Sequence, residues 1–436
     1  MTASEKKQAF VLLELMNHML LIAQEAKRRG HHVVVLNQGP LQDKGPFAVP
    51  DGLVDELVRV PSWSDAEQVG KIVDTVHATY DVVGTYAAFE ATLPFEAEIR
   101  HRAGLPTSGF HGVTQVLDKA RVRRKLYAEG LSTLRSVSLT EALAWESWEF
   151  ERSAVLKPAN GTGSALCFMV GTMDELREAA DQVAAAAVVN PMMKEYILSH
   201  GEFVLEERAE GELLSVESLV DRGEVHVVGL TGRYVSAMDP VVEQAACFPY
   251  PHPRRAEIES AARDFHAALG IGHGPTHLEV MVPDEGPIEL IDFNIRMAGL
   301  AMAVCMGNAF GIEYAVPLTD IACGERPDLA FLGNARRASA DILLLPPPEA
   351  TVMCELGFPE GTEYGRHMKE IGTPLSGRAD QLDVVGMVIV TADSVEELHD
   401  RILTVRRETL FDGRPLGDNP NNQLLFPRYH HSATLA

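Results

Sequence analysis

Alternation of apolar and polar residues predicts a β-hairpin in the second half of the chain. His277–Val282 and Ile288–Phe293 each alternate, and a turn-forming PDEG tetrapeptide lies between them. Such alternation is typical of strands with one buried face, and a short Pro- and Gly-containing segment favours a tight connection. With PDEG as the loop, Glu279 is expected across from Leu290 and diagonal to Asp292. The pattern therefore brings two carboxylates together.

The N-terminal segment has a different pattern, in which short apolar runs and helical stretches follow each other. Phe10–Leu15 is predicted as a buried strand, Leu20–Arg29 as a helix, and Val33–Leu36 as a second strand. Asp81–Thr85 continues the alternation. We therefore expect a Rossmann-like parallel-sheet domain over residues 1–115. Because no Gly-x-Gly-x-x-Gly follows the first strand, a dinucleotide site is not expected there.

The rest of the chain is predicted to form two further units. Residues 116–325 contain several strands, an amphipathic helix at Arg255–Leu269, and the Pro-containing stretch Thr231–Pro253, whose weak periodicity predicts a long loop. Residues 326–436 combine strands with a helix over Ser394–Val405, which indicates a smaller C-terminal α+β domain. The fold class expected is therefore α/β with three parts.

Composition narrows the possible partners and the compartment. The formal net charge of −24 at pH 7 argues against nucleic acid and anionic membranes, since both need clustered cations. The five cysteines form no Cys-x-x-Cys pair, which indicates reduced thiols and a cytoplasmic protein. The N-terminal apolar run contains Glu14, Asn17 and His18, and no 18-residue uncharged apolar window occurs, so neither a signal peptide nor a membrane span is expected.

Two elements carry residues suited to binding phosphate. A helix predicted over Asp118–Glu129 carries Lys119 and four further cations. Farther along, a strand ends at Lys157 and enters a loop rich in Gly, Ser and Thr. Backbone N–H groups freed by glycines can fold over phosphate oxygens, while the Lys supplies a positive charge. The alternatives are a solvated basic helix face and a plain hairpin turn.

The hairpin itself suggests a metal site. Glu279, Asp292 and Asn294 offer two carboxylates and an amide, which are the oxygen ligands that a hard ion such as Mg²⁺ prefers. The alternative is an acidic hairpin exposed to solvent. Asn294 and the nearby Arg296 favour the binding site.

The motif DFNIRMAG at Asp292–Gly299, preceded by HLE at 277–279, resembles the metal-binding signature of the ATP-grasp superfamily. Other motifs follow in the order of that superfamily: DK at the start of the basic helix, LKP before the Gly-rich loop, and a Glu-Glu pair in a later strand. The resemblance covers residues 116–325 well and the flanking parts only by layout. It implies an ATP-grasp fold for this α/β chain.

The resemblance also implies ATP and Mg²⁺ (or Mn²⁺) as cofactors. Lysines would contact the nucleotide phosphates and the linker after the Glu-Glu pair would receive adenine. The implied nucleotide contacts are Lys119, Lys157, Gly161, Gly163, Ser164, Glu206, Glu207, Ala209 and Glu212. Glu212 is a substitute for the ribose contact, because Leu213 stands where the family usually has Glu. The implied metal ligands are Glu279, Asp292 and Asn294.

Within the superfamily, the layout is most similar to the bacterial amino-acid and dipeptide ligases. These phosphorylate a carboxylate to an acyl phosphate, which an amine then attacks. The implied catalytic residues are Arg296, Lys157 and His277, and the implied substrate contacts are Arg233, Glu243 and Arg296; Glu243 could equally be a solvated loop carboxylate. Expected partners are small amino-acid or peptide substrates and a second copy in a homodimer. Alternatives are a biotin-carboxylase-like or nucleotide-biosynthesis enzyme, and a non-catalytic ATP-binding regulator.

Overall fold

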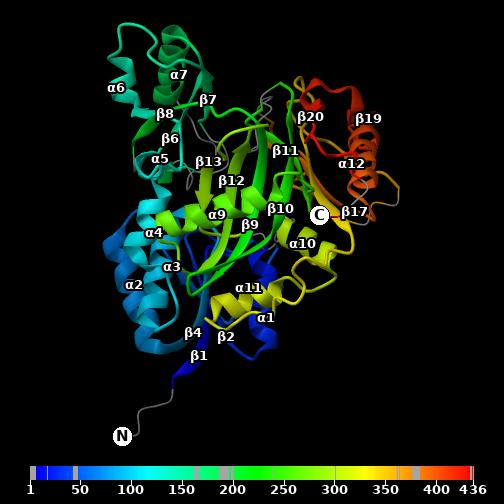
Figure 1. Cartoon of the computed structure of the whole chain (residues 1–436). Coiled ribbons are helices and arrows are strands. Elements are labelled where there is room, and N and C mark those ends of the chain that lie inside the picture. Colours follow the sequence, from blue (N-terminus) through cyan, green and yellow to red (C-terminus); the bar gives the residue numbers. More distant parts are fainter. Residues whose placement is uncertain are drawn as a thin grey trace, which may run out of the picture.

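The computed structural model describes residues 6–16, 18–42, 48–161, 166–185, 196–197, 201–238, 240–299, 301–360, 362, 364–375, 383–432 and 435. Figure 1 shows the N-terminal sheet at the bottom, a large twisted sheet in the middle, and a small sheet with its helices at the top. No helix within these ranges is long and apolar enough to cross a membrane.

The N-terminal sheet has four parallel strands in the order β3-β2-β1-β4. Its elements are β1 (Lys7–Leu13), α1 (Met19–Arg28), β2 (His32–Asn37), β3 (Glu56–Arg59), α2 (Ala66–Thr79) and β4 (Tyr80–Ala87). Most of β1 and β2 is buried, which explains why their sequences are continuous apolar runs. The predicted parallel sheet is confirmed. It is followed by η1 (Glu90–Thr92), α3 (Leu93–Arg102) and α4 (Gly109–Leu117).

A small antiparallel sheet follows, in the order β5-β8-β6-β7. Its elements and the preceding helix are α5 (Lys119–Ala128), β5 (Ser136–Ser138), α6 (Leu139–Leu143), β6 (Ala154–Pro158), β7 (Phe168–Val170), α7 (Met173–Ala185) and β8 (Phe203–Glu207). The Asp118 carboxylate accepts a hydrogen bond of 3.0 Å from the backbone N–H of Arg121, so the predicted N-cap of α5 is confirmed.

Within the described residues, the largest sheet has nine strands, eight of them in the order β13-β12-β9-β10-β11-β14-β17-β16, with β20 pairing β10. These strands are β9 (Glu212–Asp221), β10 (Glu224–Ser236), β11 (Glu243–Phe248), β12 (Gly274–Val282), β13 (Glu289–Asn294), β14 (Ala338–Leu344), β16 (Tyr364–His367), β17 (Gly386–Ala392) and β20 (Leu424–Leu425). Its helices are α9 (Arg255–Leu269), α10 (Met302–Phe310), α11 (Ala315–Ala322) and α12 (Val395–Glu408). The shorter elements are β15 (Leu356–Gly357), β18 (Leu410–Phe411), β19 (Arg414–Pro415), η3 (Leu416–Asp418) and η4 (Pro420–Asn422).

The two faces of the large sheet pack against different helices. One face forms a core with α9 and α12, to which Phe265, Leu278 and Ile402 belong. Part of the other face packs against α10 through residues such as Met306 and Ile389. The rest of this second face is polar, and it is contacted by Lys119 of α5 and lies next to Glu90 of η1.

The prediction of a long loop at Thr231–Pro253 is wrong. Strand β10 continues to Ser236, and β11 pairs with it as the second strand of a hairpin. Two features concealed these strands. Arg233 and Glu243 place charges on a sheet face, and the buried run at 245–247 is Ala-Ala-Cys, which lacks the β-branched residues typical of strands.

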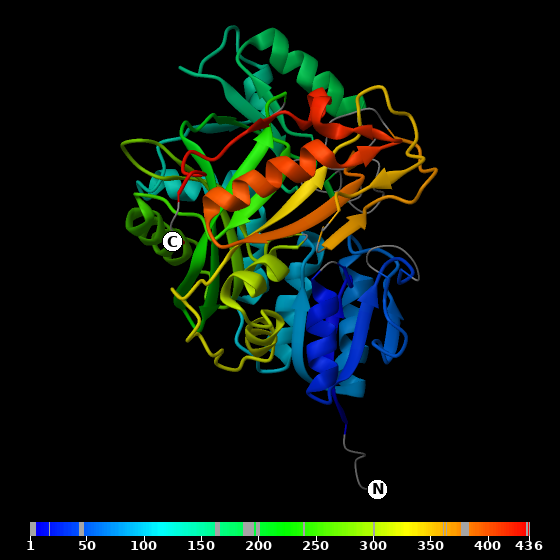
Figure 2. The same cartoon turned by 90° about the vertical axis from the view of Figure 1, so that its right-hand side faces the viewer.

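The large sheet also continues across the predicted boundary at residue 325. Strand β14 pairs with β11, and β17 pairs with β14, so residues 326–436 extend the sheet that residues 116–325 begin. Figure 2 shows these yellow and orange strands beside the green ones. The division into three domains at 115 and 325 stays a prediction.

Arg100 on α3 connects the N-terminal sheet to α11, and we predict that its removal destabilises the protein. Its guanidinium is buried and donates to the carbonyls of Thr85, Pro106, Ile321 and Ala322 over 2.6–3.2 Å. Arg100→Ala leaves these carbonyls without their donor, so the free energy of unfolding should fall by roughly 3 kcal/mol in urea titrations followed by circular dichroism.

Arg102 on the same helix is the matched control. Its ion pairs with Asp74 and Glu98 are solvent-exposed, so Arg102→Ala should cost about 0.5 kcal/mol. Equal losses for the two variants would contradict the connecting role of Arg100.

Candidate active site

The polar face of the large sheet carries two rows of charged and polar side chains. In the first row, the strand pairing places Asp292 opposite Glu279, Glu279 opposite Ser215, and Ser215 opposite Thr231. Because alternate residues of a strand share a face, residues two positions along form a second row on the same side. That row contains Asn294, His277 and Glu217.

The two central carboxylates are closer than the sequence predicted. Glu279 lies directly opposite Asp292, and Val280 opposite Leu290. The predicted pairing of Glu279 with Leu290 is wrong because the register shifts between Glu279 and Val280, where β13 has one extra residue. The irregularity aligns the two carboxylates on one face.

These carboxylates have basic neighbours. Lys119 Nζ lies 2.9 Å from Asp292 Oδ1, and Arg233 Nη2 donates to Glu279 Oε1 over 2.8 Å. Burial raises the pKa of Glu279, but Arg233 and His277 hold it well below its usual range. The Glu279 carboxylate is thus kept in the acceptor form that a cation requires.

The donor set fits a hard divalent cation. Glu279, Asp292 and Asn294 supply only oxygen ligands, as Mg²⁺ prefers. Among the residues that the structure describes, no group of three His, Cys, Asp or Glu side chains is arranged to hold a metal. Two carboxylates and an amide would therefore need further oxygens from nucleotide phosphates and water.

His277 lies in the middle of a chain of polar contacts. Its Nδ1 is 2.9 Å from Glu217 Oε1, which also accepts from Thr231 Oγ1 over 3.0 Å, and its Nε2 is 3.6 Å from Glu279 Oε1. Burial lowers the pKa of His277, but Glu217 and Glu279 outweigh this and raise the pKa to about 9. The imidazolium is therefore charged at neutral pH and holds the Glu279 carboxylate.

Arg233 and Glu243, both expected as substrate contacts, lie together. Arg233 Nη1 is 3.1 Å from Glu243 Oε1, while Nη2 reaches Glu279. Burial raises the pKa of Glu243, and Arg233 opposes this. Glu243 is not a solvated loop carboxylate, because it begins β11 and contacts the buried guanidinium of Arg233.

Arg296 is held by a residue that the sequence reasoning missed. Its Nε and Nη2 donate to Glu90 Oε1 over 2.8 and 2.5 Å, and Nη2 also approaches Asn294 Oδ1 at 3.4 Å. Glu90 is buried in η1, shortly after β4 of the N-terminal sheet. Ligands of parallel sheets gather at the carboxyl ends of strands, and this rule would have pointed to Glu90.

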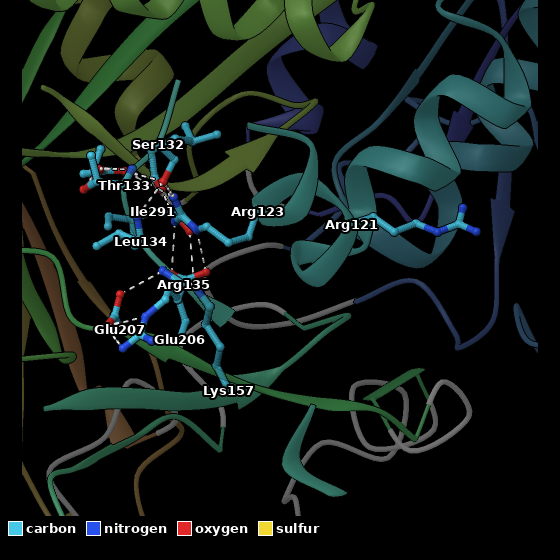
Figure 3. A network of polar contacts seen from close by, with 12 residues as sticks. Arg121, Arg123, Ser132, Thr133, Leu134, Arg135, Lys157, Glu206, Glu207 and Ile291 are labelled. Atoms are coloured by element: carbon cyan, nitrogen blue, oxygen red, sulfur yellow. Dashed lines mark hydrogen bonds and ion pairs between the residues drawn. The ribbon is translucent and has the colours of Figure 1, made fainter. Parts of the chain in front are cut away.

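Lys157 and Glu206 belong to a buried network. Lys157 Nζ donates to Glu206 Oε1 over 2.8 Å and to the carbonyl of Ile291 over 3.3 Å. Arg123 donates to the same carboxylate through Nε over 2.8 Å and through Nη2 over 3.1 Å. Burial raises the pKa of Glu206, but Lys157 and Arg123 lower it to about 2. Figure 3 shows Arg123 reaching into this network while Arg121 points away from it.

The cations of the basic helix α5 therefore make different contacts. Lys119 lies beside Asp292 and also donates to the carbonyl of Gly161 over 3.1 Å, while Arg123 supports Glu206. Arg121 is largely exposed. Lys119 and Arg123 thus serve the site, and Arg121 fits the solvated face that the sequence left as an alternative.

The remaining predicted nucleotide contacts are placed as follows. Glu207 binds the backbone N–H of Arg135 at 2.9 Å and its guanidinium, and Ala209 is buried. Glu212 accepts from Tyr250 Oη over 2.6 Å and from the backbone N–H of Arg428 over 2.8 Å, so it anchors the C-terminal segment. Gly163 and Ser164 lie outside the described residues.

Comparison with known proteins places the chain among ATP-grasp sequences. Residues 23–107 match the model of the ATP-grasp N-terminal domain, and residues 150–304 match that of the ATP-grasp domain. The chain is 26% identical over 354 residues to the uncharacterized protein y4rH of Sinorhizobium fredii, covering 78% of this chain and 70% of that protein. It is 26% identical over 144 residues to carnosine synthase 1 of Mus musculus, covering 33% of this chain and only 17% of that protein.

Solved structures show the same fold. The L-amino acid ligase from Bacillus licheniformis superposes with a TM-score of 0.76 at 19% identity, covering 94% of this chain and 99% of that one. Phosphoribosylglycinamide synthetase from Anaerococcus prevotii has a TM-score of 0.68 at 15% identity, covering 93% and 99%. The biotin carboxylase domain of Hydrogenobacter thermophilus 2-oxoglutarate carboxylase was solved with MgADP and bicarbonate. It superposes with a TM-score of 0.66 at 15% identity, covering 93% of this chain and 91% of that one.

The chain belongs to the ATP-grasp superfamily. The two domain models match in the expected order along the chain, and the fold is an α/β ATP-grasp architecture with an N-terminal parallel sheet. The resemblance found in the sequence is thereby confirmed.

We predict that Glu206 stabilises the buried network. Glu206→Gln leaves two buried cations facing a neutral amide and should lower the free energy of unfolding by about 3 kcal/mol at pH 7. Because the pKa of Glu206 falls from 4.5 to about 2 on folding, this contribution is complete above pH 4.5 and is lost as pH falls through 2. Urea titrations of both proteins between pH 3 and 7 measure the difference.

Glu207→Gln is the matched control on the neighbouring residue. Its partner Arg135 is about half exposed, so the loss should stay near 1 kcal/mol. A difference between wild type and Glu206→Gln that grew with falling pH would refute the assignment.

Proposed function

We propose that this protein is an ATP-dependent ligase that joins the carboxylate of an amino acid to the amine of another amino acid or peptide, giving ADP and phosphate. The observation that carries the proposal is the face-sharing set of Glu279, Asp292 and Asn294 beside Lys119 and Arg296. The similarity to an L-amino acid ligase over nearly the whole chain supports the same activity.

The chain's own residues suit the binding of nucleotide and metal. Glu279, Asp292 and Asn294 would hold Mg²⁺, and Lys119 and Lys157 would meet phosphate oxygens. When bound, MgATP supplies the phosphoryl group that activates the substrate carboxylate. Both lysines bind carboxylates of the protein, which keeps their ammonium groups oriented toward the site. Burial lowers the pKa of Lys119, but the Asp292 carboxylate outweighs this and raises it, so the ammonium form of Lys119 is stabilised.

Arg296 is the residue we assign to the substrate carboxylate. Glu90 fixes its Nε and Nη2, and Nη1 donates to the Met297 carbonyl at 3.1 Å, so the plane of the guanidinium is held. A fixed guanidinium is suited to stabilising the charge that develops as the activated carboxylate is attacked. Glu90 thus acts as a positioning residue from the N-terminal domain.

The other enzyme classes of the superfamily remain represented among the structural neighbours, which include a biotin carboxylase domain and a glycinamide synthetase. Their TM-scores of 0.68 and 0.66 are lower than the 0.76 of the amino acid ligase. The non-catalytic regulator is disfavoured because a purely structural ATP site has no need for an oriented Arg296.

We predict amine-dependent release of phosphate. The purified protein with ATP, Mg²⁺ and pairs of amino acids should release ADP and phosphate only with a productive pair, and mass spectrometry should find the condensation product. Glu279→Ala should abolish this release. Bicarbonate-dependent release with no amino-acid requirement would contradict the ligase and favour the carboxylase-like alternative.

Arg296→Ala should separate catalysis from nucleotide binding. We expect kcat/KM for ligation to fall about 100- to 1,000-fold, with the Kd for MgADP, measured by calorimetry, changed less than threefold. Glu90→Gln should give a smaller loss, since it frees the guanidinium without removing it. Arg255→Ala on α9 is the control, because its ion pair with Glu259 lies on a helix surface and should leave both quantities unchanged. Undiminished ligation by Arg296→Ala would refute the role.

A further inference from the structure

A buried carboxylate on β14 has no ionic partner. Asp341 is only 4% exposed. Among the described residues, no Lys, Arg or His nitrogen forms an ion pair with it within 4.0 Å. Burying a carboxylate without an ionic partner is costly, which makes Asp341 a candidate for a functional role.

The strand pairing places Asp341 beside the polar face of the site. Arg233 on β10 pairs with Ala246 on β11, and Ala246 pairs with Asp341 on β14, so the three side chains form one row across adjacent strands. The middle residue is an alanine, whose side chain is a single methyl group. Asp341 therefore faces the same side as Arg233 and lies within reach of its charge.

The charges around Asp341 are unbalanced. Burial raises its pKa, the neighbouring Glu243 carboxylate raises it further, and Arg233 with the backbone amides of Ala301 and Ala246 opposes them, leaving the pKa at about 7. Arg233 is already shared between Glu243 at 3.1 Å and Glu279 at 2.8 Å. The single guanidinium of Arg233 thus lies among three carboxylates and forms ion pairs with two of them, which leaves Asp341 without one.

Arg233 gives a second indication of a ligand at this place. Its Nε is buried and has no hydrogen-bond acceptor among the residues that the structure describes. Nη1 and Nη2 are occupied by Glu243 and Glu279, so Nε–H is a spare donor near Asp341. A ligand that carries both an ammonium group and an oxygen acceptor would satisfy Asp341 and Arg233 together. A free amino acid has this chemistry.

We propose that Asp341 binds the ammonium group of the amine substrate and accepts its proton before the amine attacks. This inference rests on the proposed ligase function and names the amine site within it. One N–H bond of the ammonium breaks and an O–H bond forms on Asp341. The freed lone pair then forms the C–N bond to the activated carboxyl carbon, and the C–O bond to phosphate breaks. Phosphate leaves with that electron pair and takes the second N–H proton, which gives the neutral amide. Glu243 shares the ammonium, and Arg233 Nε–H donates to a substrate oxygen.

The electrostatics suit this role. A carboxyl group whose pKa lies near neutrality is ionised often enough to take a proton and is basic enough to drive the transfer. The groups that face Asp341 are Arg233 from β10, Glu243 from β11 and the N-terminal backbone of α10 at Ala301. Of these groups, Arg233 is the one that carries a positive charge.

The test uses hydroxylamine, which is uncharged at neutral pH and attacks activated carboxylates without first losing a proton to a base. With the productive amino-acid pair at pH 7.5, Asp341→Asn should form the hydroxamate of the donor within threefold of the wild-type rate. Amide formation with the ammonium-bearing acceptor should fall about 100-fold or more, as expected for the loss of a general base. Asp341→Glu should recover part of the amide rate.

Ser339→Ala is the matched control on the same strand. Ser339 is buried two residues before Asp341 and donates to the Val390 carbonyl at 3.1 Å, so its loss disturbs β14 without touching the proposed base. It should leave the ratio of amide to hydroxamate unchanged. If Asp341→Asn fails to fold, Asp341→Ser is the second variant, because its hydroxyl can still accept from the backbone amides.

The outcomes are distinct. Equal losses of amide and hydroxamate in Asp341 variants would assign the residue a structural role and overturn the inference. An unchanged amide rate would overturn it as well. Wild-type protein that forms neither product would refute the proposed ligase, and the amine site with it, whereas wild-type activity with a selective amide defect in the variants supports both.

Discussion

Two carboxylates held opposite each other on adjacent strands are the constraint on which the site depends. Glu279 and Asp292 share one sheet face, and like charges at this spacing repel unless cations lie beside them. The chain supplies Lys119 from α5, Arg233 from β10 and a protonated His277 from β12 itself. The small sheet's helix and the large sheet are thus brought together by the same charges that would receive a metal and a nucleotide.

The neighbouring segments follow from this arrangement. The N-terminal domain reaches the site through Glu90, which orients Arg296, and the strands after residue 325 reach it through Asp341. Glu90 and Asp341 are both buried carboxylates beside the polar face of the large sheet. The chain therefore assembles its site from elements far apart in the sequence, with no one segment able to provide it alone.

The Lys157–Glu206–Arg123 network has a different character. It is almost fully buried and satisfies its charges internally, so Glu206 works as an internal anchor of the small sheet (Figure 3). Lys157 is bound to that anchor and to the carbonyl of Ile291 on β13. The network fixes the small sheet to the hairpin of β12 and β13, which holds Lys157 of one sheet close to a strand of the other.

The sequence by itself determined the local elements and the class of chemistry. Asp118 caps α5, Gly270 ends α9 in a left-handed conformation, and the HLE and DFNIRMAG motifs mark the ATP-grasp signature, because capping, turn conformation and alternation depend on residues close in the chain. Only the tertiary structure decided which side chains meet. The one-residue irregularity that aligns Glu279 with Asp292, the strands hidden in 231–253, and the contacts of Glu90, Glu206 and Asp341 all depend on pairing between distant segments. The energy of such pairings comes from burial and from charge compensation between strands. Neither can be read from a local sequence pattern, because the partners are far apart in the chain.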